Sequence, residues 1–367
     1  MNFIMTVTGP IAPEKLGFAS MHEHVFTDAI FAEDAFATLV GTPLKHEDPP
    51  NIDKSIGMAD LHPRHGDFIR SKDNWELDDE TLMIAEVADF KTAGGNAILE
   101  CSTPSIRRNV VGLKRISEKT GVNIIASTGL YGEETWPDKF KDMSIDDFAA
   151  FMKYEIQYGI METDFKAGHI KTSVNKITER QIDFIKAAAR VANDTGVLAT
   201  VHLGLLTTEE DNRLVYKAFL DAGIAPERLL MCNQQIFFHE VNLETLITNT
   251  DTWKLKLDSA RDVLERGINI CIDGFGRNWD VEALGIISPK DHVLMAALVA
   301  LIKEGYTHQL VIGTDVSHKI MTRRHGGYGY CRLLNYVVPT LKKVGVSDED
   351  IRKITVENPS RMLSVRS

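Results

Sequence analysis

The chain contains 367 residues, of which 44% are hydrophobic and 25% are charged, a composition typical of a globular protein. This composition excludes a disordered chain, a collagen and a coiled coil. Asp and Glu number 52 against 41 Lys and Arg, so the formal net charge is −11, which argues against a nucleic acid or an anionic membrane as the partner. We therefore expect a small-molecule partner.

Cysteine usage and hydropathy indicate a cytoplasmic protein. The four cysteines, Cys101, Cys232, Cys271 and Cys331, are far apart and form no CxxC pair, so the sequence suggests neither a disulfide framework nor a thiolate zinc site. The N-terminus lacks the pattern of a signal peptide, and the longest apolar stretch, 293–302, is too short to span a bilayer. We expect no membrane segment.

The most informative pattern is a repeated unit: an amphipathic helical stretch, a glycine, and then a short apolar run. Gly95, Gly121, Gly196 and Gly267 each stand before such a run. A glycine is typical of the left-handed residue that ends a helix, and an apolar run without polar alternation is typical of a parallel strand covered on both faces. The repetition predicts alternating strands and helices, with these glycines as helix caps.

Eight apolar runs follow one another along the chain. They span residues 17–26, 96–103, 122–129, 169–173, 197–203, 229–235, 269–275 and 310–315. Eight parallel strands alternating with helices favour a closed (β/α)8 barrel, a TIM barrel, over a doubly wound open sheet. No linker or low-complexity tract divides the sequence, so we expect one domain, 1–367.

Two connections are longer than a compact barrel needs. One runs over residues 27–77 and contains His46, His62 and His65, which we interpret as surface or lid residues, and the other runs over residues 236–253. Long loops in a compact fold are usually functional, so we interpret both as lids or partner surfaces.

Polar residues stand near the ends of the apolar runs. They are His22, His24, Glu100, Thr128, Lys171, His202, Asn233, Asp273 and Asp315. The carboxyl ends of barrel strands meet on one face, which carries the active site in enzymes of this fold. We therefore expect residues from both ends of the chain to line one pocket.

Several of these residues are candidate metal ligands. Side-chain alternation points His22 and His24 to one side of the first predicted strand and Glu23 to the other. Two imidazoles on one side can share a divalent ion, although a histidine pair also occurs as a satisfied polar element of a core. His202 and Asp315 end two other strands, where a core histidine or a helix-capping aspartate would explain either one alone. Together, nitrogen and oxygen ligands on different strands suit zinc or manganese.

Lys171 ends the fourth predicted strand and would project into the pocket. There it could act as a Schiff-base nucleophile, contact a phosphate or, once carboxylated by carbon dioxide, bridge two metal ions. The alternative without a function is a lysine whose amine reaches solvent past the strand end.

The segment from Gly17 to Phe26, which contains the histidine pair, closely resembles the first-strand signature of the phosphotriesterase family of the amidohydrolase superfamily, which includes phosphotriesterase-like lactonases. Further matches follow in family order: Ser127 to Tyr131, Ala167 to Lys171, Thr195 to His202, Ile272 to Gly276, Gly313 to Asp315 and Val356 to Pro359. The sequence is identified as a member of this family.

The resemblance implies a centre with two divalent ions, expected to be zinc. His22, His24 and Asp315 would bind one ion. An N6-carboxylated Lys171 would bridge both, and His202 with a sixth-strand histidine would bind the other. The ions would lower the pKa of bound water by several units from about 15.7, supplying a hydroxide nucleophile. Asp315 would carry the proton to the leaving group.

The sequence departs from the family on the sixth strand, where Asn233 stands in place of the family histidine. An amide oxygen is a weaker zinc ligand than imidazole, so affinity for the second ion is expected to fall. Three arrangements are open: Asn233 coordinates through its oxygen, His239 folds back from the long sixth loop, or one ion binds tightly and one exchanges. A Cys232 thiolate is a further alternative, although strand alternation points it away from Asn233.

The remaining loops carry candidate substrate-binding residues. Tyr131 matches the tyrosine that lines the lactone site of relatives, and Asp273 matches their seventh-strand acid. The loop after the eighth strand carries Lys319, Arg323 and Arg324, and such cations suit a carboxylate or phosphate of the substrate. A solvated loop or a subunit salt bridge explains these cations equally well.

We expect a metal-dependent hydrolase that opens a sugar-derived or acyl lactone. In one form of this hypothesis the lactone carries a phosphate group. A phosphoester or phosphotriester hydrolase on the same centre is the first alternative, followed by a Schiff-base aldolase using Lys171 and a non-catalytic relative. We also expect a homodimer whose partner is a small molecule, anionic if the cations of the eighth loop bind it.

Overall fold

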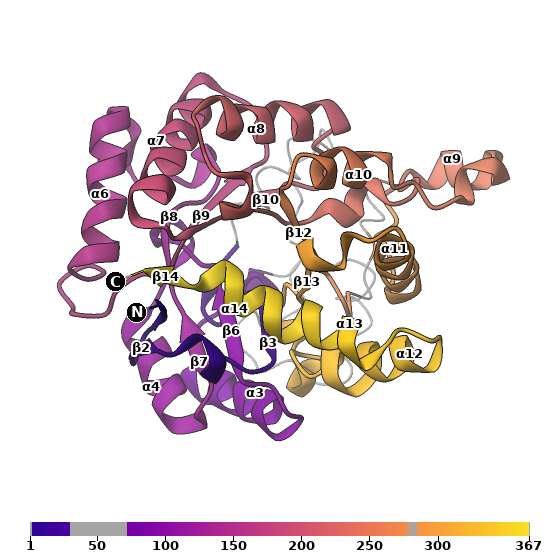
Figure 1. Cartoon of the computed structure of the whole chain (residues 1–367), viewed down its shortest axis with the longest axis horizontal. Helices are drawn as coiled ribbons and strands as arrows, with labels where there is room; N and C mark the ends of the chain where they lie inside the picture. Colours follow the sequence, from indigo (N-terminus) through magenta and orange to yellow (C-terminus); the bar gives the residue numbers. More distant parts are fainter. Residues whose placement is uncertain (1, 30–71, 278–279, 281–284, 367) are drawn as a thin grey trace.

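The computed structural model of the protein describes residues 2–29, 72–277, 280 and 285–366. Most of the connection predicted over residues 27–77, with His46, His62 and His65, lies outside the described residues. Within them, parallel strands form the centre of the molecule and helices surround the strands (Figure 1).

The central strands match the predicted apolar runs. They are β3 (Ala19–Glu23), β6 (Ala97–Glu100), β7 (Asn123–Ile125), β8 (Ser127–Leu130), β9 (His169–Val174), β10 (Leu198–Leu203), β11 (Leu229–Met231), β12 (Asn269–Ile272) and β13 (Leu310–Ile312). Neighbours pair in parallel, and β7 and β8 are consecutive parts of the third barrel strand, which pair with β6 and β9 respectively.

The barrel closes between β3 and β13. The amide of Asp315 donates to the carbonyl of His22 over 2.9 Å, and the amide of His24 donates to the carbonyl of Val316 over 3.2 Å. The first and the eighth barrel strand are thereby joined, and the predicted (β/α)8 barrel is confirmed.

Helices cover the outside of the strands (Figure 1). They are α3 (Glu80–Thr92), α4 (Val110–Thr120), α5 (Asp138–Lys141), α6 (Ile145–Gln157), α7 (Glu179–Thr195), α8 (Glu209–Asp221), α9 (Leu243–Thr248), α10 (Asp258–Glu265), α11 (Asp291–Lys303), α12 (Val338–Lys343), α13 (Asp348–Arg352) and α14 (Asn358–Leu363). None of the helices in the described ranges is both long enough and apolar enough to cross a membrane. All four cysteines are free and buried.

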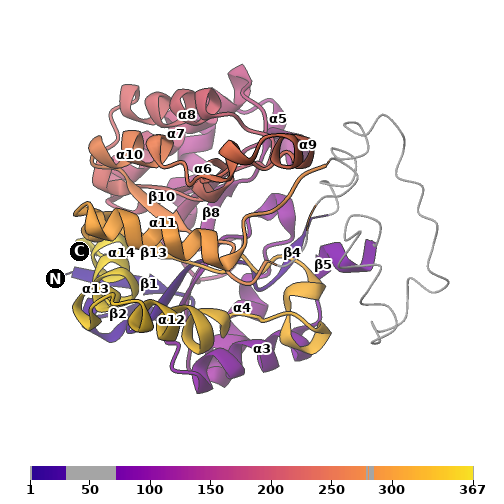
Figure 2. The ribbon, with the colours of Figure 1, turned by 90° about the vertical axis from the view of Figure 1, so that its right-hand side faces the viewer.

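Short strands mark the two ends of the barrel (Figure 2). At the end where both termini lie, β1 (Asn2–Thr6) pairs antiparallel with β14 (Val365–Arg366) and with β2 (Gly9–Ile11). At the opposite end, β4 (Thr27–Asp28) pairs with β5 (Glu76–Leu77). This ladder holds together the two ends of the long first connection.

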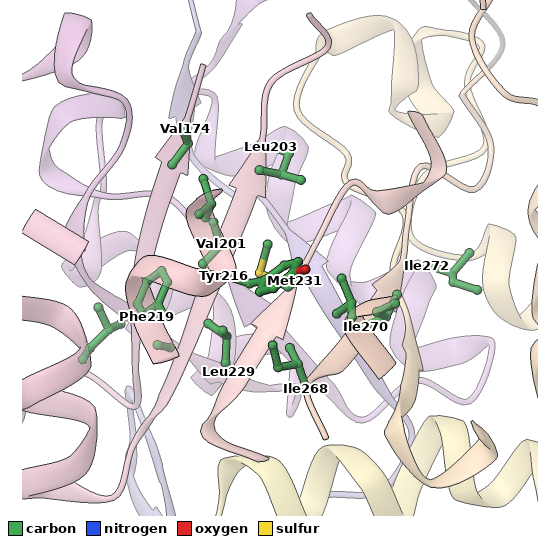
Figure 3. Close-up of a cluster of buried hydrophobic side chains, with 14 of the residues drawn as sticks. Val174, Val201, Leu203, Tyr216, Phe219, Leu229, Met231, Ile268, Ile270 and Ile272 are labelled. Carbon is green, nitrogen blue, oxygen red and sulfur yellow. The ribbon is translucent and has the colours of Figure 1, made fainter. Parts of the chain in front are cut away.

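Apolar side chains pack on both faces of the strands. Figure 3 shows part of the outer layer, where Val201 and Met231 of the sheet lie close to Phe219 of α8. The inner face carries a separate buried cluster that includes Leu198 and Val311. Because both faces are covered, the strands read as nearly continuous apolar runs.

One of the four predicted glycine caps is wrong. Gly121, Gly196 and Gly267 have the left-handed backbone expected of a helix cap, but before the second barrel strand that backbone belongs to Gly94 (φ +110°). Gly95 is required for a different reason, since a Cβ there would lie 2.3 Å from the ring of Phe90.

The long sixth connection is largely helical. It contains the short helical segment Gln234–Phe237, then α9, and then a further turn, Thr250–Trp253. Figure 1 shows α9 extending away from the barrel. The connection predicted over residues 236–253 is therefore present, with local structure of its own.

A buried carboxylate ties β3 to β6. Glu100 is fully buried and accepts hydrogen bonds from the amides of Val25 and Ser102, each over 3.2 Å. Burial raises the pKa of Glu100 to about 7. Folding therefore increases the affinity of this carboxyl group for its proton.

We predict that the free energy of unfolding of the metal-depleted protein falls as the pH rises from about 5 to about 8. The pKa of Glu100 is about 7 in the folded protein and near the ordinary 4.5 in the unfolded chain, so the folded state binds more protons over this range. Glu100→Gln should remove up to about 3 kcal/mol of this pH dependence, as measured by denaturant unfolding at several pH values. Exposed Glu118 provides the control, Glu118→Gln, and an equal slope in both variants would contradict the prediction.

Candidate metal centre

The backbone of β3 and a buried glutamate position the histidine pair. The carboxylate of Glu23 accepts hydrogen bonds from Ser20, from the amide of Thr314 over 2.8 Å and from the amide of Val316 over 3.1 Å. Glu23 therefore faces β13, and the imidazoles on either side of it face a common site. The alternation predicted for the first strand agrees with these contacts.

Two histidines and an aspartate from opposite ends of the chain meet at this site. Oδ1 of Asp315 lies 3.6 Å from Nε2 of His22 and 3.5 Å from Nε2 of His24. The three ligand atoms all lie within 4.8 Å of one another, and the three residues are buried. Imidazole nitrogens and a carboxylate oxygen at such separations fit a divalent ion such as zinc.

The other ring nitrogen of each histidine is already hydrogen-bonded. Nδ1 of His22 lies 2.7 Å from Oδ2 of Asp273, and Nδ1 of His24 lies 2.9 Å from Oγ of Ser102. In metal sites, a partner at one ring nitrogen fixes the tautomer and directs the other nitrogen to the ion. These contacts therefore favour Nε2 as the ligand atom of both histidines.

Asp315 is held as an anion. Although burial opposes ionisation, the charges of His22 and Arg277 keep the pKa of Asp315 well below its usual range. Its second oxygen, Oδ2, accepts a hydrogen bond from Nη2 of Arg277 over 2.5 Å and one from the side-chain Nδ2 of Asn233 over 3.4 Å. One oxygen thus faces the histidines, and the other faces an arginine and an asparagine.

Lys171 and His202 lie beside this group, as the sequence predicts. Lys171 is fully buried, and its Nζ lies 3.0 Å from Nε2 of His22. The ring of His202 has its centroid 5.8 Å from that of His22, and its Nδ1 has no hydrogen-bond partner among the described residues. Burial holds the pKa of His202 well below its usual value, so the imidazole is neutral, as a metal ligand must be.

Asn233 reaches the centre from the end of β11. Its backbone is left-handed (φ +59°), and its amide donates to Oδ2 of Asp273 over 3.1 Å. Its side-chain Oδ1 is buried without a hydrogen-bond partner in the part of the chain that the structure describes. An unpaired buried carbonyl oxygen is costly, and this one fits a cation ligand at the position where the resemblance implies a histidine.

The other two candidates for the second ion lie differently. His239 has its Nδ1 against the backbone carbonyl of Glu240, and it belongs to neither group of possible metal ligands found among the described residues. Cys232 lies inside the barrel, with its sulfur within 4.8 Å of ligand atoms of His22 and Asp273. Burial would raise the pKa of this thiol, but Cys271 and the charge of His22 lower it to about 6. Cys232 therefore lies near the centre, even though strand alternation points it away from Asn233.

Of the predicted substrate residues, two lie at the centre. Tyr131 packs against His202, with ring centroids 5.3 Å apart. Asp273 is at the centre as well, but its Oδ2 binds His22 and the amide of Asn233. Asp273 therefore positions a candidate metal ligand, His22.

The three cations of the eighth loop pair with carboxylates elsewhere. Arg323 and Arg324 bind Asp89 of α3, and Arg324 also binds Glu86 over 2.8 Å. Lys319 pairs with Asp73. These contacts give the predicted anion-binding role no support, because the charges are neutralised within the protein.

Arg277 is the residue of the centre that sequence reasoning missed. The sequence from Asp273 to Arg277 reads Asp-Gly-Phe-Gly-Arg. An arginine that follows two glycines at the end of a strand is the sequence signal that points to this residue. Its contact with Asp315 depends on a loop conformation that periodicity does not report.

Comparison with known proteins agrees with this geometry. The profile of the phosphotriesterase family matches residues 2–363. A protein of Nematostella vectensis named phosphotriesterase-related protein is 28% identical over 98% of both chains. The Homo sapiens protein named N-acetyltaurine hydrolase is 26% identical over 99% of this chain and 98% of its own length.

Solved structures share the fold. A resiniferatoxin-binding protein from Rhodobacter sphaeroides has a TM-score of 0.83 and 26% identity, with coverage of 98% of this chain and 94% of its own. A lactonase from Listeria monocytogenes has a TM-score of 0.74 and 21% identity over the whole of both chains. At that identity the lactonase shows likeness of fold alone.

We predict that Zn²⁺ raises the melting temperature of metal-depleted protein, because an ion that binds only the folded state stabilises that state. At a free Zn²⁺ concentration a hundredfold above Kd, the free energy of unfolding should rise by about 2.7 kcal/mol. His24→Asn should abolish most of the rise. Exposed His292 provides the matched control, His292→Asn, which should keep it. Differential scanning calorimetry measures the shift, and an undiminished rise in His24→Asn would overturn the assignment.

Proposed function

Because the chain belongs to the phosphotriesterase family, we propose that it is a metal-dependent hydrolase that opens a lactone. This proposal rests on one observation, a buried cluster of two histidines and an aspartate with a lysine and a third histidine beside them. The side chains proposed to hold two ions, expected to be zinc, are His22, His24 and Asp315 for the first and Lys171, His202 and Asn233 for the second.

When bound, divalent ions would lower the pKa of a water molecule and polarise the carbonyl group of the substrate. The protein's own residues hold the groups around that carbonyl. Asp273 fixes the ring of His22 and Ser102 that of His24. The carboxylate of Asp315 is the proposed proton acceptor for the attacking water, and it would return that proton to the leaving oxygen.

Lys171 is proposed to be N6-carboxylated. Its neutral amine would add to carbon dioxide with loss of a proton, which converts a buried cation into an anionic oxygen ligand. Its full burial and its position 3.0 Å from Nε2 of His22 support this role over that of a Schiff-base nucleophile, which must reach a carbonyl substrate.

A second candidate is hydrolysis of an N-acyl amide. Relatives named N-acetyltaurine hydrolase, from several vertebrates and Dictyostelium discoideum, are 25% to 27% identical over 99% of this chain. Attack on an amide carbonyl requires the same polarised carbonyl and the same proton transfer by Asp315 as attack on a lactone. The same centre would therefore serve both reactions, and the part of the substrate outside the carbonyl group would decide between them.

We predict that Zn²⁺-loaded protein hydrolyses a member of a panel of lactones and N-acyl amides, and that Asp315→Asn lowers kcat/KM by about 10²–10⁴-fold. Asp142→Asn, at an exposed aspartate, is the control and should keep full activity. Metal content is measured in parallel to separate a lost ligand from a lost proton acceptor. Equal rates in the two variants would contradict the proposed role.

A further inference from the structure

The loop after β12 folds back over the metal centre. Gly274 and Gly276 both have left-handed backbones (φ +82° and +88°), which glycine adopts at no steric cost. The amide of Gly276 donates to Oδ1 of Asp291 over 2.7 Å, which anchors the turn to α11. This turn brings Arg277 to Asp315, so that the guanidinium lies at the edge of the proposed ligand set.

A buried amide lies on the other side of Gly274. Gln235, in the helical segment that follows β11, is 2% exposed, and neither its Oε1 nor its Nε2 has a hydrogen-bond partner among the described residues. A Cβ on Gly274 would lie 3.3 Å from Nε2 of Gln235 and 3.8 Å from Cζ of Arg277. The absence of a Cβ at Gly274 therefore leaves room beside both the amide and the guanidinium.

An unsatisfied buried amide costs about 1–3 kcal/mol. Such a cost is expected where a ligand supplies the missing partner, because buried polar groups are otherwise paired. The Arg277 side chain is 12% exposed, so the guanidinium is largely desolvated. Desolvation strengthens its attraction for an anion.

The charge balance of the centre also favours an anion. With Lys171 carboxylated as proposed, Lys171, Asp273 and Asp315 carry three negative charges against the one positive charge of Arg277. Two bound divalent ions would leave this group of side chains net positive, in a protein whose overall charge is −11. An ion at Oδ1 of Asp315 would leave Arg277 at Oδ2 of the same carboxylate.

We propose that Arg277 and Gln235 form a subsite, kept open by Gly274, that binds one anionic group of the substrate, a carboxylate or a sulfonate. The guanidinium supplies charged donors and the amide a neutral donor, a combination that suits an oxyanion. This inference rests on the proposed function and makes it more specific. The substrate is a small acyl compound that carries an anionic group a short distance from the scissile carbonyl.

The binding test uses Zn²⁺-loaded protein and probes that contain no hydrolysable ester. Propane-1-sulfonate and butyrate are compared with their neutral counterparts, propane-1-sulfonamide and butyramide, by ligand-observed NMR. Both anions should bind at least tenfold more tightly than their counterparts. Arg277→Met should remove this preference, and Arg277→Lys should keep part of it, because charge remains but the planar donor pair is lost. Arg213→Met, at an exposed arginine, is the control.

Metal content is measured in every variant. Anions that bind equally well to the Arg277→Met protein at full metal content bind the ion directly, and this result would overturn the subsite. Equal binding of anionic and neutral probes to the unmodified protein would overturn it as well.

Gln235→Met separates recognition from structure. Because it removes an unpaired amide at similar volume, the melting temperature should stay the same or rise, while anion affinity falls severalfold. A falling melting temperature with unchanged anion affinity would make Gln235 a structural residue.

Turnover distinguishes failure of the subsite from failure of the proposed function. N-acetyltaurine, N-acetyl-β-alanine and the neutral N-acetylethanolamine are compared, together with lactones that do and do not carry a carboxylate. Arg277→Met should raise KM at least tenfold for the anionic members, and kcat/KM should fall at least tenfold more for them than for the neutral ones, which change only through the lost contact between Arg277 and Asp315. Anion binding without turnover of any compound contradicts the proposed function alone, whereas turnover without preference for anions contradicts the subsite alone.

Discussion

The hydrogen bonds that join β3 to β13 are the interaction on which the centre depends. The first and last strands of the barrel carry the two histidines and the aspartate, and only closure of the barrel brings them together. The amides of Asp315 and His24 each bind a carbonyl of the opposite strand. Glu23 strengthens the same seam, since its buried carboxylate accepts hydrogen bonds from Thr314 and Val316. The chemistry thus follows from the closure of the fold.

The barrel and the positions of most of the proposed ligands could be predicted because both are consequences of burial. Strands covered on both faces leave continuous apolar runs, and the polar residue that ends such a run stands on the catalytic face. His22, His24, Lys171, His202 and Asp315 were found in this way. The cap before the second barrel strand could not be placed in this way, because the sequence Gly94-Gly95 offers two glycines and their packing, with Gly95 against Phe90, distinguishes them.

The residues around the ligands depend on loop conformation and could not be derived. Arg323 and Arg324 carry the charge expected of an anion site, but Asp89 of α3 lies opposite them. Arg277 gives only a weak signal in the sequence because its approach to Asp315 requires two left-handed glycines, one on each side of Phe275. Gln235 gives no signal in the sequence, since an unpaired amide is recognised only once its surroundings are known.

Asn233, where the family resemblance implies a histidine, and Arg277 both bear on the charge of the centre. An amide oxygen holds a second ion more weakly than imidazole, while a guanidinium beside Asp315 adds a positive charge that cannot dissociate. The guanidinium is the feature that supports the proposed recognition of an anionic substrate. Anomalous diffraction from crystals of the purified protein tests the central claim most directly. The account predicts a metal peak about 2.0–2.2 Å from Nε2 of His22, Nε2 of His24 and Oδ1 of Asp315, with any second peak beside His202 and Asn233. Metal-containing crystals without a peak at the first position would contradict it.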